Sequence, residues 1–123
     1  MTKPTDNQEI NQMLSVILES LKEKKAQDLV SIDFKSLNLS LCDYFVIAHA
    51  TSTTQVHAMA HHIQDQMKEK LGMRPAFVEG MENAEWIILD YLDIVIHLFL
   101  EDSRKFYDLE SLWADAALEH HYD

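Results

Sequence analysis

The chain has 123 residues, 47% of them hydrophobic, and it contains two glycines and two prolines. This length and composition exclude a disordered or low-complexity chain, so we predict that residues 1–123 form a single domain. Ten basic side chains against 21 acidic ones give a formal net charge of −11, which disfavours nucleic acid and anionic membranes as partners and favours a basic protein.

The N-terminal region is predicted to form an amphipathic helix over residues 6–24. Apolar residues recur there at the spacing of one helical face, from Ile10 to Leu21. Thr5 followed three positions later by Gln8 has the pattern of a capping box. Thr5 is therefore expected to cap this helix.

Residues 25–114 are predicted to form an α/β core. Runs rich in β-branched and aromatic residues indicate five strands, at residues 28–34, 44–48, 75–79, 85–91 and 93–100. The run 44–48 is almost entirely apolar, which is typical of a strand buried on both faces. A second helix is expected between Ser52, which begins another capping box, and Gly72, which suits a left-handed C-cap.

A β-hairpin is expected in the second half of the chain. The predicted strands 85–91 and 93–100 are nearly contiguous, so they should pair antiparallel through a turn at residues 90–93. The apolar run from Trp86 to Leu100 is shorter than the roughly 20 residues of a membrane span and contains charged residues. It indicates a core segment of the protein, and no membrane interaction is predicted.

The last third of the chain is predicted to end with a helix and a tail. Helical spacing of apolar residues predicts a helix over residues 102–114, with Phe106 and Trp113 in the core. Residues 115–123 have little to pack and are expected to form a tail. The element order α-β-β-α-β-β-β-α then predicts the α/β class, with a mixed five-stranded sheet and helical cover.

Two histidines on the second predicted helix have a spacing that can serve a metal ion. His57 and His61 are four residues apart, but both lie at the flank of the apolar stripe. Ala58 stands where zinc proteases carry glutamate, so we interpret the two histidines as a solvated boundary pair. His62 is expected at the surface. We predict no metal site and no cofactor.

Carboxylates offer the strongest argument for catalysis. Asp90 and Asp93 flank the predicted hairpin and would suit Mg²⁺ in nucleotidyl transfer. Such an enzyme also needs a phosphate cradle, and the only candidate, residues 50–54, has no glycine and no basic neighbour. Cys42 has no nearby His or cationic residue in sequence to lower the pKa of its thiol. No catalytic residue is therefore predicted.

Cys42 is also the only cysteine in the chain and cannot form an internal disulfide. A reducing compartment suits such a chain, and the first ten residues lack the apolar core of a signal peptide. The cytoplasm is therefore the expected location.

Aromatic residues near acidic ones favour a protein-binding surface. Trp86 and Tyr91 bracket a predicted strand whose centre is already apolar, and an exposed tryptophan beside carboxylates is typical of a hot spot for a basic partner. His97 interrupts the apolar run of the following strand. A core or half-exposed histidine with a carboxylate partner and a binding residue remain equal alternatives there.

An ordered set of short motifs resembles the Iojap family, the bacterial ribosomal silencing factors. The motifs are Asp43–Ile47, Thr51-Ser52 with Gln55-Val56, Val78–Gly80, Glu85-Trp86, Leu89–Tyr91, Asp93 with Val95 and His97, and Arg104–Trp113. Each motif alone is weak, but their order from about Leu21 to Trp113 is specific. The resemblance implies a fold like that of nucleotidyltransferases without their catalytic residues.

The resemblance implies a translational repressor active in stationary phase or starvation. Such a protein binds the large ribosomal subunit through its fourteenth protein and sterically blocks joining of the small subunit. The partner-binding residues expected from the motifs and the acidic–aromatic pattern are Trp86, Asp90, Tyr91, Asp93, His97, Arg104 and Tyr107. No direct reading of nucleic acid is expected.

Two positions depart from the family pattern. Thr54 stands where the family usually has arginine, so any contact of that arginine is lost. Leu92 stands where the hairpin usually has glycine. Because leucine resists a positive φ, either the turn type differs or Leu92 is strained. Two alternative functions remain: a metal-dependent nucleotidyltransferase using Asp90 and Asp93, and a structural homodimer formed through an exposed strand edge.

Overall fold

The structure, a computed structural model, describes residues 6–37 and 42–122. Its helices are α1 (Asn7–Glu23), α2 (Thr53–Leu71) and α3 (Glu101–Tyr107), and its strands are β1 (Gln27–Asp33), β2 (Tyr44–Ala50), β3 (Phe77–Glu79), β4 (Trp86–Asp90), β5 (Ile94–Leu100) and β6 (Ala117–His120). Two short 3₁₀ helices, η1 (Lys35–Leu37) and η2 (Leu109–Trp113), complete the described elements.

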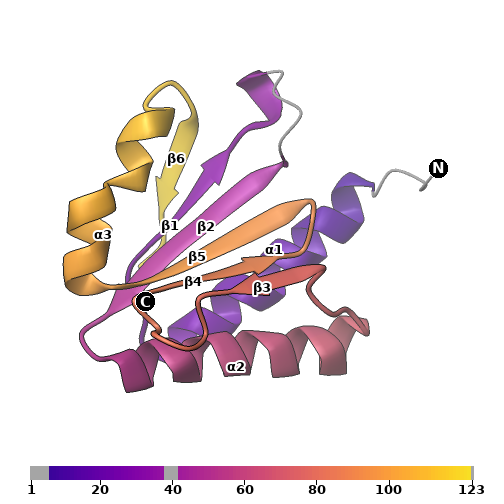
Figure 1. Cartoon of the computed structure of the whole chain (residues 1–123). Coiled ribbons are helices and arrows are strands. Elements are labelled where there is room, and N and C mark those ends of the chain that lie inside the picture. Colours follow the sequence, from indigo (N-terminus) through magenta and orange to yellow (C-terminus); the bar gives the residue numbers. More distant parts are fainter. Residues whose placement is uncertain (1–5, 38–41, 123) are drawn as a thin grey trace.

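The strands form one mixed sheet in the order β3-β4-β5-β2-β1-β6 (Figure 1). Only β2 and β5 are parallel, and every other neighbouring pair is antiparallel. The predicted α/β class, mixed sheet and β4–β5 hairpin are confirmed. The predicted number of five strands is wrong, since the sheet has six.

The sixth strand lies where a tail was predicted at residues 115–123. β6 pairs antiparallel with β1, and the backbone N–H of His121 donates to the carbonyl of Leu29 over 2.8 Å. The ring Nε2 of His121 lies 2.8 Å from the hydroxyl of Ser31. All four side chains of β6 are exposed, so this edge strand is held by backbone pairing and carries no apolar pattern.

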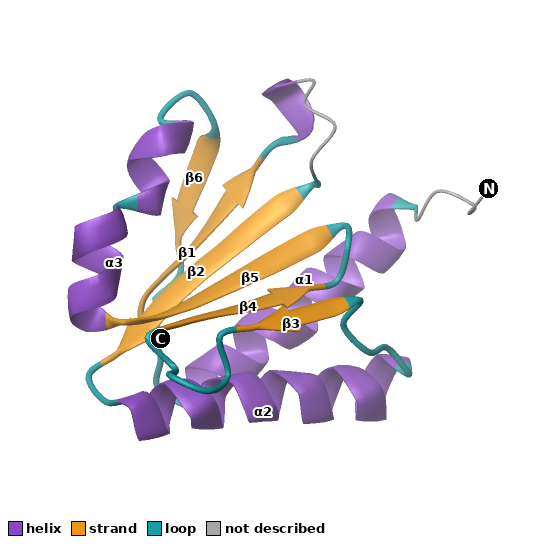
Figure 2. Cartoon of the chain, in the orientation of Figure 1, coloured by secondary structure: helices purple, strands orange, loops and turns teal. Residues whose placement is uncertain are grey.

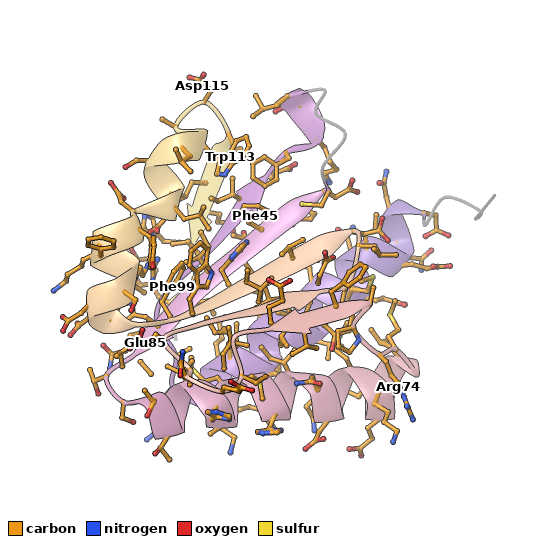
Figure 3. The ribbon with its side chains drawn as sticks, in the orientation of Figure 1. Phe45, Arg74, Glu85, Phe99, Trp113 and Asp115 are labelled. Atoms are coloured by element: carbon orange, nitrogen blue, oxygen red, sulfur yellow. The ribbon has the colours of Figure 1, made fainter. Side chains whose placement is uncertain are left out.

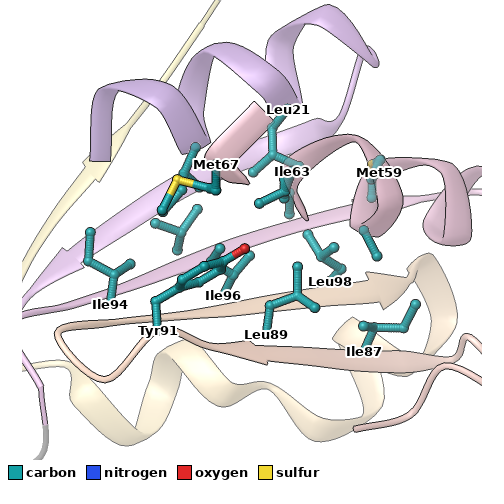
Figure 4. Packing of buried hydrophobic residues seen from close by; sticks show 14 of the residues in the cluster. Leu21, Met59, Ile63, Met67, Ile87, Leu89, Tyr91, Ile94, Ile96 and Leu98 are labelled. Atoms are coloured by element: carbon teal, nitrogen blue, oxygen red, sulfur yellow. The ribbon is translucent and has the colours of Figure 1, made fainter. Parts of the chain in front are cut away.

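Helices α1 and α2 cover one face of the sheet, and Figure 2 shows both on the same side. Alternate residues of the strands turn to these helices, so that Ile87 and Leu89 of β4 and Ile96 and Leu98 of β5 are fully buried (Figure 4). Tyr91, just after β4, belongs to the same cluster. This face holds the main hydrophobic core.

Local signals explain where the two long helices begin and end. Asp6 caps α1 by accepting a hydrogen bond from the N–H of Glu9 over 2.8 Å, whereas the predicted cap, Thr5, lies outside the described residues. Ser52 caps α2 as predicted, by accepting from Gln55 over 3.1 Å. Gly72 ends α2 in the predicted left-handed conformation, with φ +64°.

The predicted helix over residues 102–114 is interrupted. α3 ends at Tyr107, Asp108 follows with a left-handed φ of +46°, and the chain continues as the 3₁₀ helix η2. This break changes the face that each side chain occupies. Phe106, predicted in the core, is 81% exposed, whereas Trp113 packs edge-on against Phe34 at 4.9 Å between ring centroids. The prediction for Phe106 is therefore wrong.

None of the helices formed by residues 6–37 and 42–122 is both long enough and apolar enough to cross a membrane.

Candidate protein-docking surface

The sheet face opposite α1 and α2 is covered only in part. α3 and η2 lie over the part near β1 and β2, where Phe45, Phe99 and Trp113 gather on the side facing the viewer in Figure 3. The remaining part, over β3, β4, β5 and the start of β2, is open and hollowed by a cavity of about 450 Å³. We call this part the open face. The side chains that line it are Cys42, Phe45, Phe77, Glu79, Ile88, Asp90, Val95 and His97.

Strand register brings these side chains into rows across four strands. Phe77 pairs with Asp90, Asp90 with Val95, and Val95 with Phe45. In the next row, Ile88 pairs with both Glu79 and His97. Because paired residues project to the same side of a sheet, the two rows form one continuous surface.

Aromatic rings close the open face on the side of α3. The ring of Trp86 stacks on Phe99, with centroids 4.9 Å apart, and lies 4.7 Å from the ring of Tyr107. Tyr107 is 52% exposed, and Phe106 lies beside it at 5.1 Å. The apolar surface therefore continues from the sheet onto α3.

A glycine fixes the backbone next to Trp86. Gly80 has φ +84°, and a Cβ atom at this position would overlap the carbonyl oxygen of Trp86. Only glycine permits this close approach. The backbone of this chain therefore requires the glycine of the motif Val78–Gly80.

His97 lies on the floor of the open face and is 5% exposed. The indole Nε1–H of Trp86 donates to its Nδ1 over 3.1 Å, and its ring centroid is 4.5 Å from that of Phe45. Burial lowers the pKa of His97 to about 4. At neutral pH the ring is therefore uncharged, and because Nδ1 accepts a hydrogen bond, the proton is on Nε2.

Carboxylates stand at the margin of the open face. Glu79 and Asp90 line the cavity, and Asp90 also accepts a hydrogen bond from the N–H of Leu92 over 2.8 Å. Burial, and then the nearby charge of Asp93, raise the pKa of Asp43. An apolar surface with a negative margin is complementary to a basic protein.

Two of the predicted partner-binding residues, Tyr91 and Arg104, do not line the open face. Tyr91 is 4% exposed and packs on the helix-covered face, so it contributes to the core. Arg104 is 8% exposed, and its guanidinium bonds to Glu110 over 2.9 Å and to the carbonyl of Asp28 over 2.7 Å. Arg104 therefore ties α3 and η2 to β1, and its contact with a partner remains a prediction.

Trp86, Asp90, His97 and Tyr107 are brought together on or beside the open face, and Asp93 lies in the turn that ends it. Their contact with a partner remains a prediction. Four further residues that share this surface were not among the predicted partner-binding residues: Phe45, Phe77, Ile88 and Val95. The alternation Trp86-x-Ile88-x-Asp90 was the available signal, because alternate residues of a strand project to one face.

The remaining candidate groups are the histidines of α2 and the thiol of Cys42. His57 and His61 stack with centroids 5.8 Å apart at the edge of α2, His57 half-buried and His61 exposed, as expected of a boundary pair. His62, predicted at the surface, is half-buried and lies 2.8 Å from the carboxylate of Glu23.

Burial raises the pKa of the Cys42 thiol to about 12, which disfavours a nucleophilic thiolate. Within residues 6–37 and 42–122, no three His, Cys, Asp or Glu side chains are grouped to hold a metal ion.

Comparisons with known proteins agree with one another. The family model "Ribosomal silencing factor during starvation" matches residues 7–123. The ribosomal silencing factor RsfS of Bacillus subtilis is 38% identical over 106 residues, which cover 86% of this chain and 88% of that protein. A mouse protein named "Mitochondrial assembly of ribosomal large subunit protein 1" is 32% identical over 81% of this chain and 44% of its own length. A crystal structure from Chromobacterium violaceum superposes with a TM-score of 0.80 at 33% identity, covering 85% of this chain and 86% of that one.

Proposed function

The chain belongs to the ribosomal silencing factor (RsfS) family, and from this premise we propose that it represses translation during starvation by binding the large ribosomal subunit. In this proposal the open face docks on the fourteenth protein of that subunit, and the bound domain prevents the small subunit from joining. The family names indicate a regulatory factor rather than an enzyme. The cytoplasm, where bacterial subunits join, is the proposed place of action.

The observation that carries this proposal is the open face itself. It combines exposed and half-buried apolar side chains, including Phe77 and Val95, with the carboxylates of Glu79 and Asp90. The whole chain has a net charge of −11, which favours encounter with a basic ribosomal protein. The name of the mouse relative, which refers to the large ribosomal subunit, supports the choice of subunit.

Steric occlusion follows from the size of the domain. A compact chain of 123 residues has a radius of gyration of roughly 14 Å, so it is at least about 25 Å across. A body of this size on the face where the subunits meet cannot remain in a closely packed joint. The repressor therefore needs no catalytic group.

The test is sedimentation of the purified chain with separated ribosomal subunits. We expect the chain to sediment with large subunits and to stay in the supernatant with small subunits. Sedimentation with small subunits, or with neither, would contradict the proposal. A salt titration adds information, because a charge-assisted interface should weaken as ionic strength rises.

The order of addition tests occlusion directly. Added before the subunits join, the chain should reduce the fraction of complete ribosomes in proportion to its occupancy on large subunits. Added to ribosomes that have already joined, it should act only as fast as they dissociate. Rapid inhibition of joined ribosomes whose subunits stay together would contradict occlusion.

A further inference from the structure

The open face contains one polar atom whose bonding is incomplete. The Nε2 atom of His97 is buried and has no hydrogen-bond partner among the residues that the structure describes. Its other ring nitrogen, Nδ1, is occupied by the indole N–H of Trp86. A buried N–H donor without an acceptor costs free energy in the free protein, so its presence requires an explanation.

The cavity beside His97 gives an acceptor a route to this ring. Nδ1 points toward Trp86, which does not line the cavity, whereas His97 does line it. Nε2 is the ring nitrogen that does not take part in the hydrogen bond to Trp86, and because His97 lines the cavity, a shift of the side chains that cover Nε2 would let an acceptor in the cavity reach it. The cavity of about 450 Å³ is large enough to admit part of a partner chain.

We propose that His97 is a specificity-determining residue of the docking surface, and that its Nε2–H donates to a carbonyl oxygen that the protein partner inserts into this cavity. This inference rests on the proposed function and adds to it the chemistry of the central contact. Because Nε2 is covered in the free protein, the acceptor reaches it only when cavity side chains shift on docking.

The surroundings select an uncharged acceptor. Glu79 and Asp90 line the same cavity, so a carboxylate or phosphate of a ligand would be repelled there. Phe45, Ile88 and Val95 supply apolar walls, in which a main-chain or amide carbonyl is the neutral acceptor that a protein offers. A basic partner can at the same time place its cations on the acidic margin.

The test measures both the affinity for large subunits and the stability of the free chain, because loss of a purely structural histidine would lower the stability and leave the affinity unchanged. In His97→Leu, the orphaned donor is removed while the volume is nearly kept. We expect its affinity for isolated large subunits to fall by about tenfold, because the partner's carbonyl is left unpaired. This substitution also leaves the indole N–H of Trp86 without its acceptor, so the effect on stability is compared in a Trp86→Phe background.

A second pair of variants, made in a Trp86→Phe background, separates the effect of Nε2 from the loss of the hydrogen bond to Trp86. Trp86→Phe keeps an aromatic ring but has no indole N–H that loses its acceptor when His97 is replaced. Comparing Trp86→Phe with Trp86→Phe/His97→Leu should give the same fall in affinity and a gain in stability. Both measurements use the full chain, with urea unfolding for stability and sedimentation titration for affinity.

The outcomes separate this inference from the proposed function. If the wild type does not bind large subunits, the proposed function fails and this inference fails with it. If the wild type binds and His97→Leu binds equally well, only the inference fails. Loss of stability in the Trp86→Phe background with unchanged affinity would show that His97 has a structural role, with an enclosed water as its acceptor.

Discussion

The two faces of the sheet are made from alternate residues of the same strands, yet they differ in burial and in hydrogen bonding. On the face under α1 and α2, the side chains of Ile94, Ile96 and Leu98 are fully buried among apolar neighbours. On the open face, Val95 is half-buried and His97 has a donor without an acceptor. The first face stabilises the fold, and the second retains surface and hydrogen-bonding capacity that a partner can use.

The largest expected effect tests the stabilising role of the covered face. Ile96→Ala should lower the free energy of unfolding by about 3–4 kcal/mol, because a fully buried side chain leaves a cavity. Its neighbour Val95 projects to the open face, so Val95→Ala should lose only about 1 kcal/mol or less. Urea unfolding measures both, and equal losses would show that the two faces are not distinct in stability.

A substitution on the open face should mainly lower the affinity for large subunits, whereas one on the covered face should mainly lower stability. Trp86→Ala removes a half-buried aromatic side chain beside Tyr107, and we expect affinity for large subunits to fall by about 2 kcal/mol, roughly thirtyfold. The control on the same strand is Ile87→Val, which removes one methylene from the covered face. It should cost stability by about 1 kcal/mol and leave affinity unchanged. A Trp86→Ala chain that fails to fold would place Trp86 with the core.

The pH dependence of stability reports the buried histidine of the open face. Burial lowers the pKa of His97 from 6.5 to about 4, so between these values the unfolded chain binds a proton that the folded chain does not. Stability that is complete above pH 6.5 is therefore lost as the pH falls toward 4. Between pH 7 and pH 5, the wild type should lose about 2 kcal/mol more than His97→Leu.

Other groups do not obscure this difference. The pKa values of His49 and His121 are also lowered, mainly by burial, so they shift stability in the same direction, but the variant retains both. Glu79 and Asp90, which line the cavity with His97, are also common to both chains. Parallel pH profiles of the wild type and the variant would contradict the burial of a neutral His97.

The covered face was predictable from the sequence because periodicity directly reports burial. The spacing of apolar residues in α1 and α2, the cap at Ser52 and the left-handed Gly72 all specify local structure without long-range information. The apolar runs of β2 and β5 also identified the central strands. These elements are fixed by patterns within single segments.

The wrong predictions concern features that the apolar spacing of a segment does not report. β6 has four exposed side chains and is formed by backbone pairing with β1, so its sequence has no strand pattern. Phe106 was assigned to the core by a helical period that Asp108 interrupts. Arg104 and Tyr91, which were also predicted to bind the partner, are buried in this chain, so their motifs have a packing role whether or not they bind. A recurring motif does not by itself distinguish a structural residue from a binding one.

The two faces meet in the turn after β4, where Asp90 belongs to the open face and Tyr91 to the covered face. Leu92, the next residue, has φ +73°, so the strain expected from its departure from the family pattern is present. An L-residue with a side chain pays about 1–2 kcal/mol in this region, and glycine avoids that cost.

Leu92→Gly should therefore be more stable than the wild type by about 0.5–1 kcal/mol, since part of the gain is offset by the greater freedom of glycine in the unfolded chain. Little apolar burial is lost, because Leu92 is 61% exposed. Leu92→Ala is the matched control: it keeps a Cβ at positive φ and should show no gain. Affinity for large subunits should be the same in both variants, because the hydrogen bond from the backbone N–H of residue 92 to Asp90 does not use the side chain of Leu92. A gain in Leu92→Ala equal to that in Leu92→Gly would assign the effect to loss of the exposed side chain, whereas a change in affinity would show that the turn itself belongs to the docking surface.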